Sequence, residues 1–373
     1  MTLHWGMGPL SSILSQSRLN HLNTIFVDPN CPPGVTRGLS CFNGITGELL
    51  FISDTKKPVR ISRRKLKSFL AEGLSIQNGR ELASIEQSPD QKMHVHLKDG
   101  GVITGDVVIG ADGARSKVRE HLVGPRDNQL TDIPMSMFNF TSKVGAETAK
   151  KIRALNPLFI AAFHPNNGDY FWLSVQDAQD PNDPENWVFQ FFVSWSDYEL
   201  STEDVLNTKE GRMRFFKKRA TSYCEPWRSA ALAVDESLDL RLDKGAYWGN
   251  ARRFDNHGGR VTICGDAAHP MTPHRGQGLN NALLDASNIV SALYSVADGE
   301  KSFQEAIDGY DAEMIQRGKL EMEVSYKQTM MVHNWDMVMD SPMAKYGTRE
   351  VKADMLQKIR DISVIKAREV VEV

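Results

Sequence analysis

The sequence of 373 residues is poor in features that would each place it in a special class of proteins. It has four cysteines, and no two of them form a C-x-x-C pair, which excludes a disulfide framework and a structural zinc site. No apolar run approaches the roughly 20 residues that a membrane-spanning helix needs. The first residues lack the basic-then-apolar pattern of a signal peptide. We therefore expect an intracellular, cytoplasmic protein.

An excess of charge of one sign is also missing. Lys and Arg number 44 and Asp and Glu number 47, so the formal net charge is −3. Without a basic excess to neutralise phosphates, the chain is not expected to bind nucleic acid. The apolar share of 41% and the charged share of 24% are those of an ordinary globular protein and exclude wholesale disorder. The length is suited to two domains or to one large α/β unit with an insertion.

The first third of the chain alternates between helical and strand-like patterns. We expect a short helix over 9–20, a short strand over 24–28, a hairpin near 39–52 and a helix over 62–70 that Ser62 caps. A strand that becomes continuously apolar is predicted over 102–109, as in a sheet that is buried on both faces.

The rest of the chain changes character twice. Residues 130–200 are aromatic and strand-like, and we interpret them as a separate, mostly antiparallel sheet. Helical patterns follow at 202–230, a short buried strand at 261–264 and a long helix at 279–297. From Ser302 onward the periodicity is mostly helical.

Two junctions between a strand and a helix carry the most chemistry. At the first, residues 105–119 read G-D-V-V-I-G-A-D-G-A-R-S-K-V-R, with Asp112 and Gly113 in the turn and a helix that begins near Ser116. Glycine lets a ligand approach the main chain closely, and a helix start offers free N–H groups to anionic or polar ligand atoms. Alone, this segment is better explained as a simple Asp-Gly turn that joins a strand to a helix.

The second junction is richer. Residues 261–280 read V-T-I-C-G-D-A-A-H-P-M-T-P-H-R-G-Q-G-L-N, so a buried strand meets Gly-Asp and a loop of prolines and glycines opens a long helix. Asp266 at the strand end can accept hydrogen bonds from a cofactor's hydroxyl groups. The helix start at Gly276–Gly278 can stabilise negative charge on a cofactor ring. Ligands of open α/β sheets bind at the carboxyl ends of the strands, where both junctions are expected.

Other site types receive less support. His94 and His96 lie two residues apart on one strand face, but a metal site needs a third ligand, so exposed strand histidines are the simpler interpretation. We expect His269 and His274 to form hydrogen bonds in a rigid loop rather than to transfer protons. G-x-S-x-G and H-E-x-x-H motifs are absent, which argues against a hydrolase.

Together the two junctions resemble the G-A-D-G-x-x-S-x-V-R and G-D-A-x-H-x-x-x-P-x-x-G-Q-G-x-N motifs of the FAD-dependent aromatic monooxygenases of the para-hydroxybenzoate hydroxylase type. The fungal, salicylate-hydroxylase-like enzymes of secondary metabolism are the most similar branch. The segment that contains Arg63 and Leu66 resembles the family's R-x-x-L segment, whose Arg contacts FAD. Gln316-Arg317-Gly318 also matches the fungal branch.

The resemblance implies an FAD-dependent enzyme that uses NADPH or NADH and O2 to hydroxylate or epoxidise an aromatic or polyketide-like molecule. It places Asp266 at the flavin's ribityl chain and Gly276, Gln277, Gly278 and Leu279 beside the pyrimidine edge of the ring. Asp112 and Gly113 would lie near the pyrophosphate and the path of NAD(P)H. Because the flavin carries the chemistry, no catalytic side chain is assigned.

The implied fold is a three-layer, Rossmann-like α/β domain for FAD and NAD(P), with an inserted β-sheet domain and C-terminal helices. We expect the FAD-binding domain to comprise 1–129 and 241–300, with the hairpin in its first part. The inserted substrate domain would comprise 130–240, and a helical region 301–373.

The sequence departs from the family at its beginning. Members open with a strand and G-x-G-x-x-G, which cradles the FAD pyrophosphate. Here the nearest match is Gly6-Met7-Gly8-Pro9-Leu10-Ser11, which has serine at the third glycine and no preceding strand, so we interpret it as a chance match. Two explanations stay open: an incomplete sequence of a longer enzyme, or a truncated, non-catalytic relative that binds a ligand or partner but holds FAD weakly or not at all.

Overall fold

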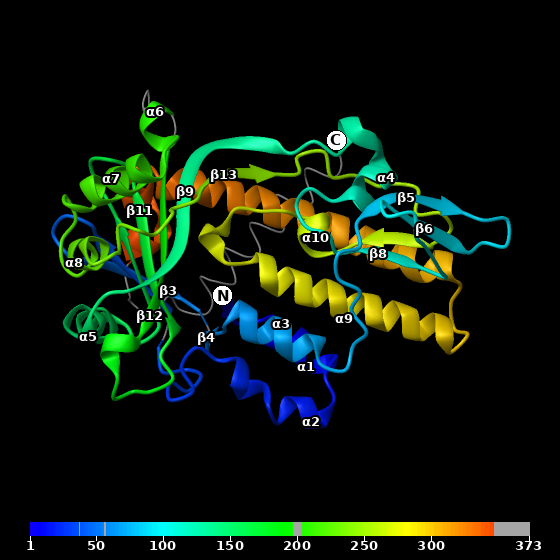
Figure 1. Ribbon diagram of the computed structural model, residues 1–373, viewed down its shortest axis with the longest axis horizontal. Helices are drawn as coiled ribbons and strands as arrows, with labels where there is room; N and C mark the ends of the chain where they lie inside the picture. Colours follow the sequence, from blue (N-terminus) through cyan, green and yellow to red (C-terminus); the bar gives the residue numbers. More distant parts are fainter. Residues whose placement is uncertain (37, 56, 197–202, 347–373) are drawn as a thin grey trace.

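The computed structural model describes residues 1–36, 38–55, 57–196 and 203–346. One large sheet stands at one end of the molecule and smaller sheets at the other, with two long helices between them (Figure 1). These helices are α9 (Gly278–Ala297) and α10 (Phe303–Val332), and they pack against each other. The predicted α/β fold with C-terminal helices is confirmed.

The large sheet has seven strands in the described part of the chain, in the order β13-β9-β12-β11-β10-β2-β3. All neighbours are antiparallel except β2 and β10. The strands are β2 (Gly38–Asn43), β3 (Leu49–Asp54), β9 (Thr131–Lys143), β10 (Phe159–Phe163), β11 (Tyr170–Asp177), β12 (Val188–Ser196) and β13 (Leu242–Tyr247). The hairpin predicted near 39–52 is confirmed as β2 and β3. It pairs with β10, so the sheet takes strands from outside 130–240.

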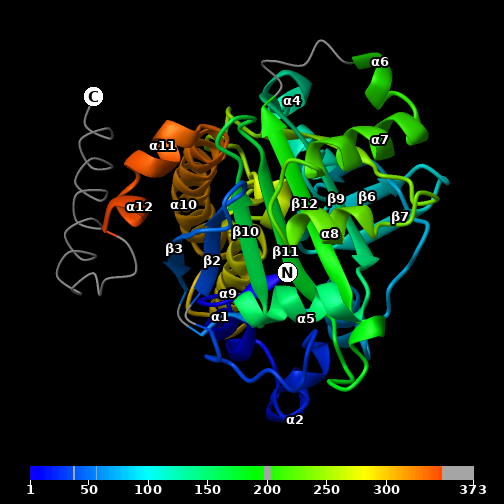
Figure 2. The same cartoon turned by 90° about the vertical axis from the view of Figure 1, so that its left-hand side faces the viewer.

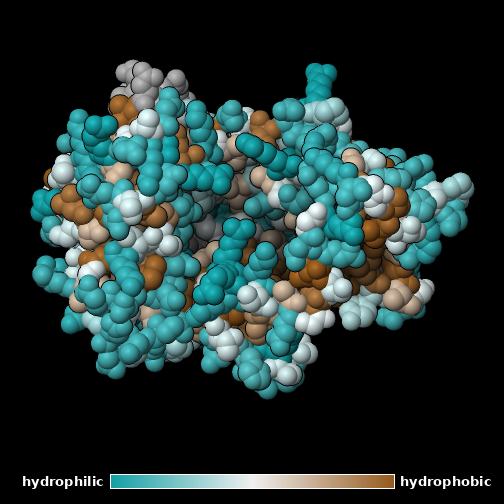
Figure 3. All heavy atoms as spheres, viewed as in Figure 1, coloured by the Kyte–Doolittle hydropathy of each residue, from teal (hydrophilic) through white to brown (hydrophobic). Residues whose placement is uncertain are grey.

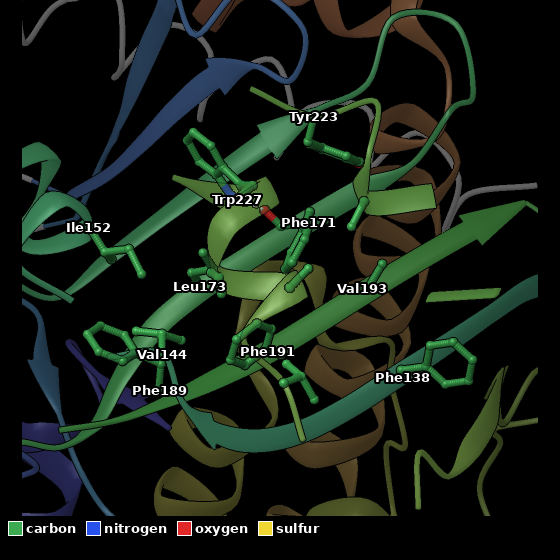
Figure 4. Packing of buried hydrophobic residues seen from close by; sticks show 14 of the residues in the cluster. Phe138, Val144, Ile152, Phe171, Leu173, Phe189, Phe191, Val193, Tyr223 and Trp227 are labelled. Atoms are coloured by element: carbon green, nitrogen blue, oxygen red, sulfur yellow. Dashed lines mark hydrogen bonds between the residues drawn. The ribbon is translucent and has the colours of Figure 1, made fainter. Parts of the chain in front are cut away.

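Helices cover one face of this sheet (Figure 2). They are α5 (Ala146–Leu155), α7 (Lys209–Ala220) and α8 (Trp227–Leu232), and the short α6 (Glu203–Leu206) precedes α7. Alternate residues of β12, including Phe189 and Phe191, point into this core, as the two-residue period of a strand requires. The indole N–H of Trp227 donates to the Phe171 carbonyl at 3.1 Å (Figure 4).

The other face of the sheet packs against the C-terminal helices. The end of α10 and the helix α11 (Trp335–Asp340) supply Val332 and Val338 to a cluster with Tyr170 and Phe192. The helix α12 (Pro342–Tyr346) contacts β3. This second face is the one that looks toward α9 and α10.

Two smaller sheets form the other end of the molecule. One is antiparallel, with β5 (Leu82–Gln87), β6 (Met93–Leu97) and β7 (Val102–Gly105). Another is the parallel pair β8 (Val108–Gly110) and β14 (Val261–Ile263), and β8 leads into α4 (Lys117–Asp127). A third pairs β1 (Thr2–Leu3) with β4 (Val59–Arg60), ahead of α3 (Arg63–Ala71).

Two predictions near the beginning of the chain need correction. The single helix predicted over 9–20 is two helices, α1 (Met7–Ser12) and α2 (Gln16–Leu19), because Ser15 adopts an extended backbone and caps α2. The strand predicted over 24–28 is wrong. Residues Leu22–Ile25 form a 3-10 helix that local bonds hold, including one from Thr24 Oγ1 to the His21 carbonyl.

The strand predicted over 102–109 is also wrong as a single buried element. It divides into β7 and β8, which belong to different sheets. The break falls at Asp106, whose carboxylate pairs with Lys92 at 2.6 Å and so stays at the surface. Val102 on β7 is 54% exposed, because β7 is an edge strand.

Other predictions are confirmed. Ser62 caps α3, Ser116 caps α4, and all three residues of β14 are buried. The helices expected over 202–230 and 279–297 are present as α6 to α8 and as α9. Within the described ranges, no helix combines the length and the apolar character needed to cross a membrane. All four cysteines are free thiols.

Candidate functional site

The fold brings the two junctions of the sequence together. Strands β8 and β14 run parallel, with Ile263 opposite Gly110, so both strands end at the same edge. Beyond the strands, the backbone N–H of Cys264 donates to the Gly110 carbonyl at 2.9 Å. A side chain at Gly110 would collide with Val118, so glycine there lets α4 pack closely onto the strand. The loops of both junctions therefore face the same region.

Arg119 fastens the two loops to each other. Its guanidinium is fully buried and donates to the Ala114 carbonyl of the first loop at 2.6 Å and to the Ala267 carbonyl of the second at 2.9 Å. It also donates to Asn128 Oδ1 and lies over the Trp248 ring. Burial lowers the pKa of Arg119 to about 10, so the group stays charged at neutral pH. The sequence shows Arg119 only as part of a motif and does not reveal this contact.

Asp112 and Gly113 lie in the first loop, as predicted, and Asp112 has a structural task there. One carboxylate oxygen of Asp112 accepts from the backbone N–H of Lys117 at 2.7 Å and of Val118 at 3.2 Å, at the start of α4. Gly113 has a φ of +82°, and nothing lies within 4 Å of where a Cβ would stand. The loop thus has an open side, which the second carboxylate oxygen of Asp112 can face.

Asp266 stands free at the second junction. Its side chain is exposed and makes no hydrogen bond or ion pair with any residue that the structure describes. A Cβ built on Gly278 would lie 3.8 Å from Asp266 Oδ1, so the carboxylate stands beside the first turn of α9. A free carboxylate next to a helix start can accept hydrogen bonds from a ligand without losing bonds of its own.

The start of α9 is open in the same way. Gly276 has a φ of +62°, with empty space around its Cβ position, and no side chain of Gln277 caps the helix. The first backbone N–H bonded within the helix is that of Asn281, to Gln277 O. Leu279 packs its side chain into an apolar cluster with α1 and α3. The backbone N–H groups of residues 277–280 therefore remain for a ligand.

The segment ahead of α1 lies against this helix start. Asn280 Oδ1 accepts from the backbone N–H of His4 at 3.2 Å and of Gly6 at 3.0 Å. The Trp5 indole donates to Gln277 Oε1 at 2.9 Å. The prediction that no strand precedes the chance match is wrong, because β1 (Thr2–Leu3) lies ahead of it. Gly8, the second glycine of the chance match, lies inside α1 and forms no glycine loop. Figure 3 shows the surface hollowed between the large sheet and the start of α9.

A buried network holds the second loop from behind. Asp285 on α9 accepts from the Gly265 backbone N–H at 2.7 Å, from His269 Nε2 at 2.7 Å and from Arg317 on α10 at 2.5 Å. Although burial acts to raise it, the bonds and charges of His269 and Arg317 hold the pKa of Asp285 below its ordinary value. Gly318 leaves room for His269, because a Cβ at position 318 would lie only 3.0 Å from the His269 side chain. This network explains the Arg317-Gly318 pair, which the sequence shows only as a marker of one branch.

Arg63 lies on the first turn of α3 and is exposed, with no partner among the described residues. Its helix is held near the start of α9, because Leu66 shares an apolar cluster with Leu279 and Leu283. The placement of Arg63 against the cofactor remains a prediction.

Arg60 was not foreseen at all. Its guanidinium is only 4% exposed and donates to Ser174 Oγ at 2.8 Å and to Gln190 Oε1 at 2.9 Å. These partners lie on β11 and β12, so Arg60 ties the β4–α3 connection to the large sheet. Burial lowers the pKa of Arg60 to about 10. Nothing in the local sequence separates it from the neighbouring arginines of α3, because its role depends on strands more than 100 residues away.

The strand histidines lie elsewhere. His94 Nδ1 is 2.9 Å from Thr104 Oγ1, and His96 Nε2 is 3.4 Å from Glu86. Within the described ranges, no three potential metal ligands come together.

Comparison with known proteins identifies the family. The FAD binding domain family matches residues 66–325. The FAD-dependent monooxygenase phnB of Penicillium herquei is 33% identical over 353 residues, which cover 93% of this chain and 84% of that protein. The chain therefore belongs to the FAD binding domain family and is an FAD-dependent monooxygenase.

Solved structures show the same fold. The HpxO protein of Klebsiella pneumoniae, in complex with FAD and uric acid, aligns with a TM-score of 0.70 at 18% identity, over 93% of this chain and 82% of that one. PqsL of Pseudomonas aeruginosa, in complex with 2-aminobenzoylacetate, aligns with a TM-score of 0.66 at 18% identity, over 91% and 88%.

The residues of this chain suit FAD. Two glycines, Gly113 and Gly276, have backbone conformations that side chains disfavour and open space where a Cβ would be. Asp266 offers an unpartnered carboxylate, and the start of α9 offers unpaired N–H groups. The ribityl hydroxyls of FAD need hydrogen-bond acceptors, such as the Asp266 carboxylate. The electron-accepting flavin ring needs donors, such as the N–H groups at the start of α9.

Proposed function

We propose that the chain uses NADPH or NADH and O2 to place one oxygen atom on an aromatic or polyketide-like small molecule. Overall, a substrate C–H, O2, NAD(P)H and a proton give the hydroxylated product, NAD(P)+ and water. The observation that carries this proposal is the free carboxylate of Asp266 beside the uncapped start of α9, at the side of the molecule that faces the large sheet.

The cofactor-binding roles follow from these contacts. When bound, FAD would supply the redox chemistry, namely hydride acceptance from NAD(P)H and activation of O2. Asp266 accepts hydrogen bonds from the ribityl hydroxyls. The start of α9 at Gly276–Leu279 carries the positive end of a helix dipole and stabilises negative charge on the reduced ring. Gln277 and Gly278 bring backbone N–H groups to the same edge.

The pyrophosphate side of the cofactor is assigned to the first junction. Gly113 leaves the main chain open there, and Asp112 keeps the start of α4 in place through its capping bonds. Arg63, exposed and without a partner in the described part, is assigned a contact with FAD from α3, which lies near the start of α9. The path of NAD(P)H runs past the same loop.

The substrate is expected at the face of the large sheet that looks toward α9. Trp172 on β11 stacks on Phe159 on this face, whereas Trp187 and Trp195 lie in the core on the opposite face. The related HpxO and PqsL structures hold uric acid and 2-aminobenzoylacetate, both small ring compounds. These observations favour a planar, oxygenated substrate.

We also propose a cytoplasmic location for the protein, which its four free thiols support.

Oxygen transfer tests this function. The purified chain, saturated with FAD, is supplied with NADPH or NADH under 18O2 and a panel of phenols and aromatic polyketides, and products are analysed by mass spectrometry. Incorporation of one 18O atom per molecule supports the proposal, and the product's connectivity separates hydroxylation from epoxidation or Baeyer–Villiger insertion. A folded chain that oxidises no NAD(P)H and labels no compound contradicts it and favours a non-catalytic relative.

A further inference from the structure

A buried histidine cluster joins the turn ahead of α9 to the large sheet. We define it by His274, His333, Ser194 and Thr329. The Ser194 hydroxyl oxygen lies 3.0 Å from His274 Nε2 and 2.9 Å from His333 Nε2, and His274 Nδ1 lies 2.9 Å from Thr329 Oγ1. Ser194 and Thr329 are fully buried. None of these four residues is assigned a direct contact with the cofactor above.

The members of the cluster come from three separate parts of the fold. Ser194 lies on β12, His333 is the C-terminal cap of α10, and His274 lies in the short 3-10 turn Pro273–Arg275, two residues before Gly276. The rings of Tyr170 and Phe192, from the same face of the sheet, meet the His274 ring edge-on at 5.4 and 5.3 Å. The turn that opens α9 is thus held by the sheet on one side and by α10 on the other.

The hydrogen-bond count makes the cluster an ordered unit. The Ser194 hydroxyl has one proton, so it can donate to only one imidazole and must accept from the other. The two Nε2 atoms therefore take opposite roles, one as donor and one as acceptor. Burial lowers the pKa of His333 to about 4 and that of His274 well below its ordinary value, so both rings are neutral at pH 7. Removing the shared hydroxyl leaves two buried imidazole nitrogens without a partner.

Thr329 contacts the turn ahead of α9 at a second residue, Thr272, besides His274. The Thr329 hydroxyl oxygen lies 2.7 Å from Thr272 Oγ1 and 2.9 Å from the Ser325 carbonyl of α10, and the Thr272 hydroxyl donates to the same carbonyl at 3.0 Å. The residues on both sides of Pro273 are therefore anchored to the same stretch of α10. A turn held at two successive points has little freedom to shift the glycines that follow it.

We propose that His274 is a positioning residue, which acts through Ser194 and His333 to hold the flavin-binding start of α9 in register with the substrate face of the large sheet. The inference rests on the proposed function, because it assigns this cluster a task at the proposed flavin site. It predicts that a change at Ser194, on a sheet strand and outside the flavin motifs, weakens FAD binding.

FAD affinity of purified variants tests this inference, measured by flavin fluorescence with FAD alone as the probe. Ser194→Ala and His274→Leu are each expected to raise the dissociation constant for FAD about tenfold, because each leaves a buried polar group without its hydrogen-bond partner. His274→Gln, whose side-chain amide can reach the Ser194 hydroxyl, should stay within threefold of the unchanged chain. Because the residues act as one unit, the double variant Ser194→Ala with His274→Leu should be no worse than either single variant by more than twofold.

The matched control is Ser142→Ala, a serine of the same sheet that donates only to the neighbouring Lys143 carbonyl. Visible circular dichroism of bound FAD adds a readout that general destabilisation does not move: the flavin bands should change in Ser194→Ala and not in Ser142→Ala. If Ser194→Ala and His274→Leu bind FAD as tightly as the unchanged chain, with an unchanged spectrum, the positioning role is wrong. If the unchanged chain binds no FAD, the proposed function fails as well.

Discussion

At the scale of single residues, two buried charged side chains, Arg119 and Asp285, hold in place the loop that carries the exposed carboxylate of Asp266. Arg119 joins the first loop to the second from one side, and Asp285 fixes the second loop from behind through Gly265 and His269. With this support, Asp266 can stay free of protein partners. Such an arrangement preorganises a site, because the groups that meet the ligand need not be withdrawn from other bonds.

Arg119→Met is expected to lower the free energy of unfolding by about 2–4 kcal/mol, because several buried acceptors lose their donor. Urea unfolding followed by circular dichroism measures this loss. Arg115→Met, at an exposed position of the same loop, is the control and should change stability by less than about 0.5 kcal/mol. Equal stabilities of the two variants would show that Arg119 does not fasten the loops.

Asp266→Asn is expected to weaken FAD binding about tenfold or more, because it replaces a charged hydrogen-bond acceptor with a neutral one. Fold stability should be nearly unchanged, since the carboxylate has no partner among the described residues. Asp298→Asn, exposed at the other end of α9, serves as control. Fluorescence titration with FAD distinguishes the two, and equal affinities would remove Asp266 from the site.

Residues that lie in continuous motifs could be predicted from the sequence, and residues that depend on chain folding could not. Asp266 and Gly276 follow from their spacing within one loop, and the structure finds both open to a ligand. Arg60 and Ser194 act only because distant strands lie beside them. No local pattern marks such residues.

At the scale of elements, the start of α9 is the part of the fold on which the site depends most. It is uncapped, it follows a turn anchored to α10 and to the sheet, and Gly276 sets its direction with a left-handed backbone. Long helices with clear periodicity, such as α9, were predictable from the sequence. Short apolar runs were not: residues 24–28 and 102–109 have the composition of strands, but their structure is decided by local bonds and by which sheet has a free edge.

Gly276→Ala provides a test of this helix start, and its matched control is Gly299→Ala, just beyond the other end of α9. Gly276 and Gly299 both have positive φ, +62° and +74°, and both have open space around the Cβ position. Alanine at either position should therefore cost a similar amount, about 1 kcal/mol of folding stability. Only Gly276→Ala is expected to weaken FAD binding, because its methyl group enters the ligand side. Equal FAD affinities of the two variants would contradict the placement of the ring.

At the scale of the whole molecule, the fold sets a large, aromatic sheet against a smaller parallel unit and joins them through α9 and α10 (Figure 1). The α/β class, the antiparallel insertion and the order of segments were predictable, because they follow from hydrophobic period and motif order. The pairing of the early hairpin with β10 was not predictable, because that parallel contact joins segments more than 100 residues apart.

The buried histidine cluster predicts a pH dependence of global stability. His333 has an ordinary pKa of 6.5 and a lowered pKa of about 4 in the fold, so the unfolded chain binds more protons between these values. Stability should therefore fall as the pH decreases from 6.5 to 4, by up to about 1.4 kcal/mol per pH unit for one imidazole. Burial raises the pKa of Asp311 to about 6, and this carboxyl acts in the opposite direction.

Comparison with His333→Asn isolates the histidine, because the contribution of Asp311 is common to both proteins. The variant should be less stable at pH 7, and its deficit should shrink as the pH approaches 4. Urea unfolding at several pH values measures the difference. A deficit that is constant with pH would mean that His333 is not held neutral by its surroundings.

We propose that the two glycine–aspartate junctions, held together by Arg119, bind FAD with its ring at the start of α9. A crystal structure of the chain with FAD tests this most directly. We predict a flavin ring against Gly276–Leu279, with ribityl hydroxyls within hydrogen-bond distance of Asp266. FAD bound elsewhere on the chain, or crystals without FAD despite saturating cofactor, would contradict it.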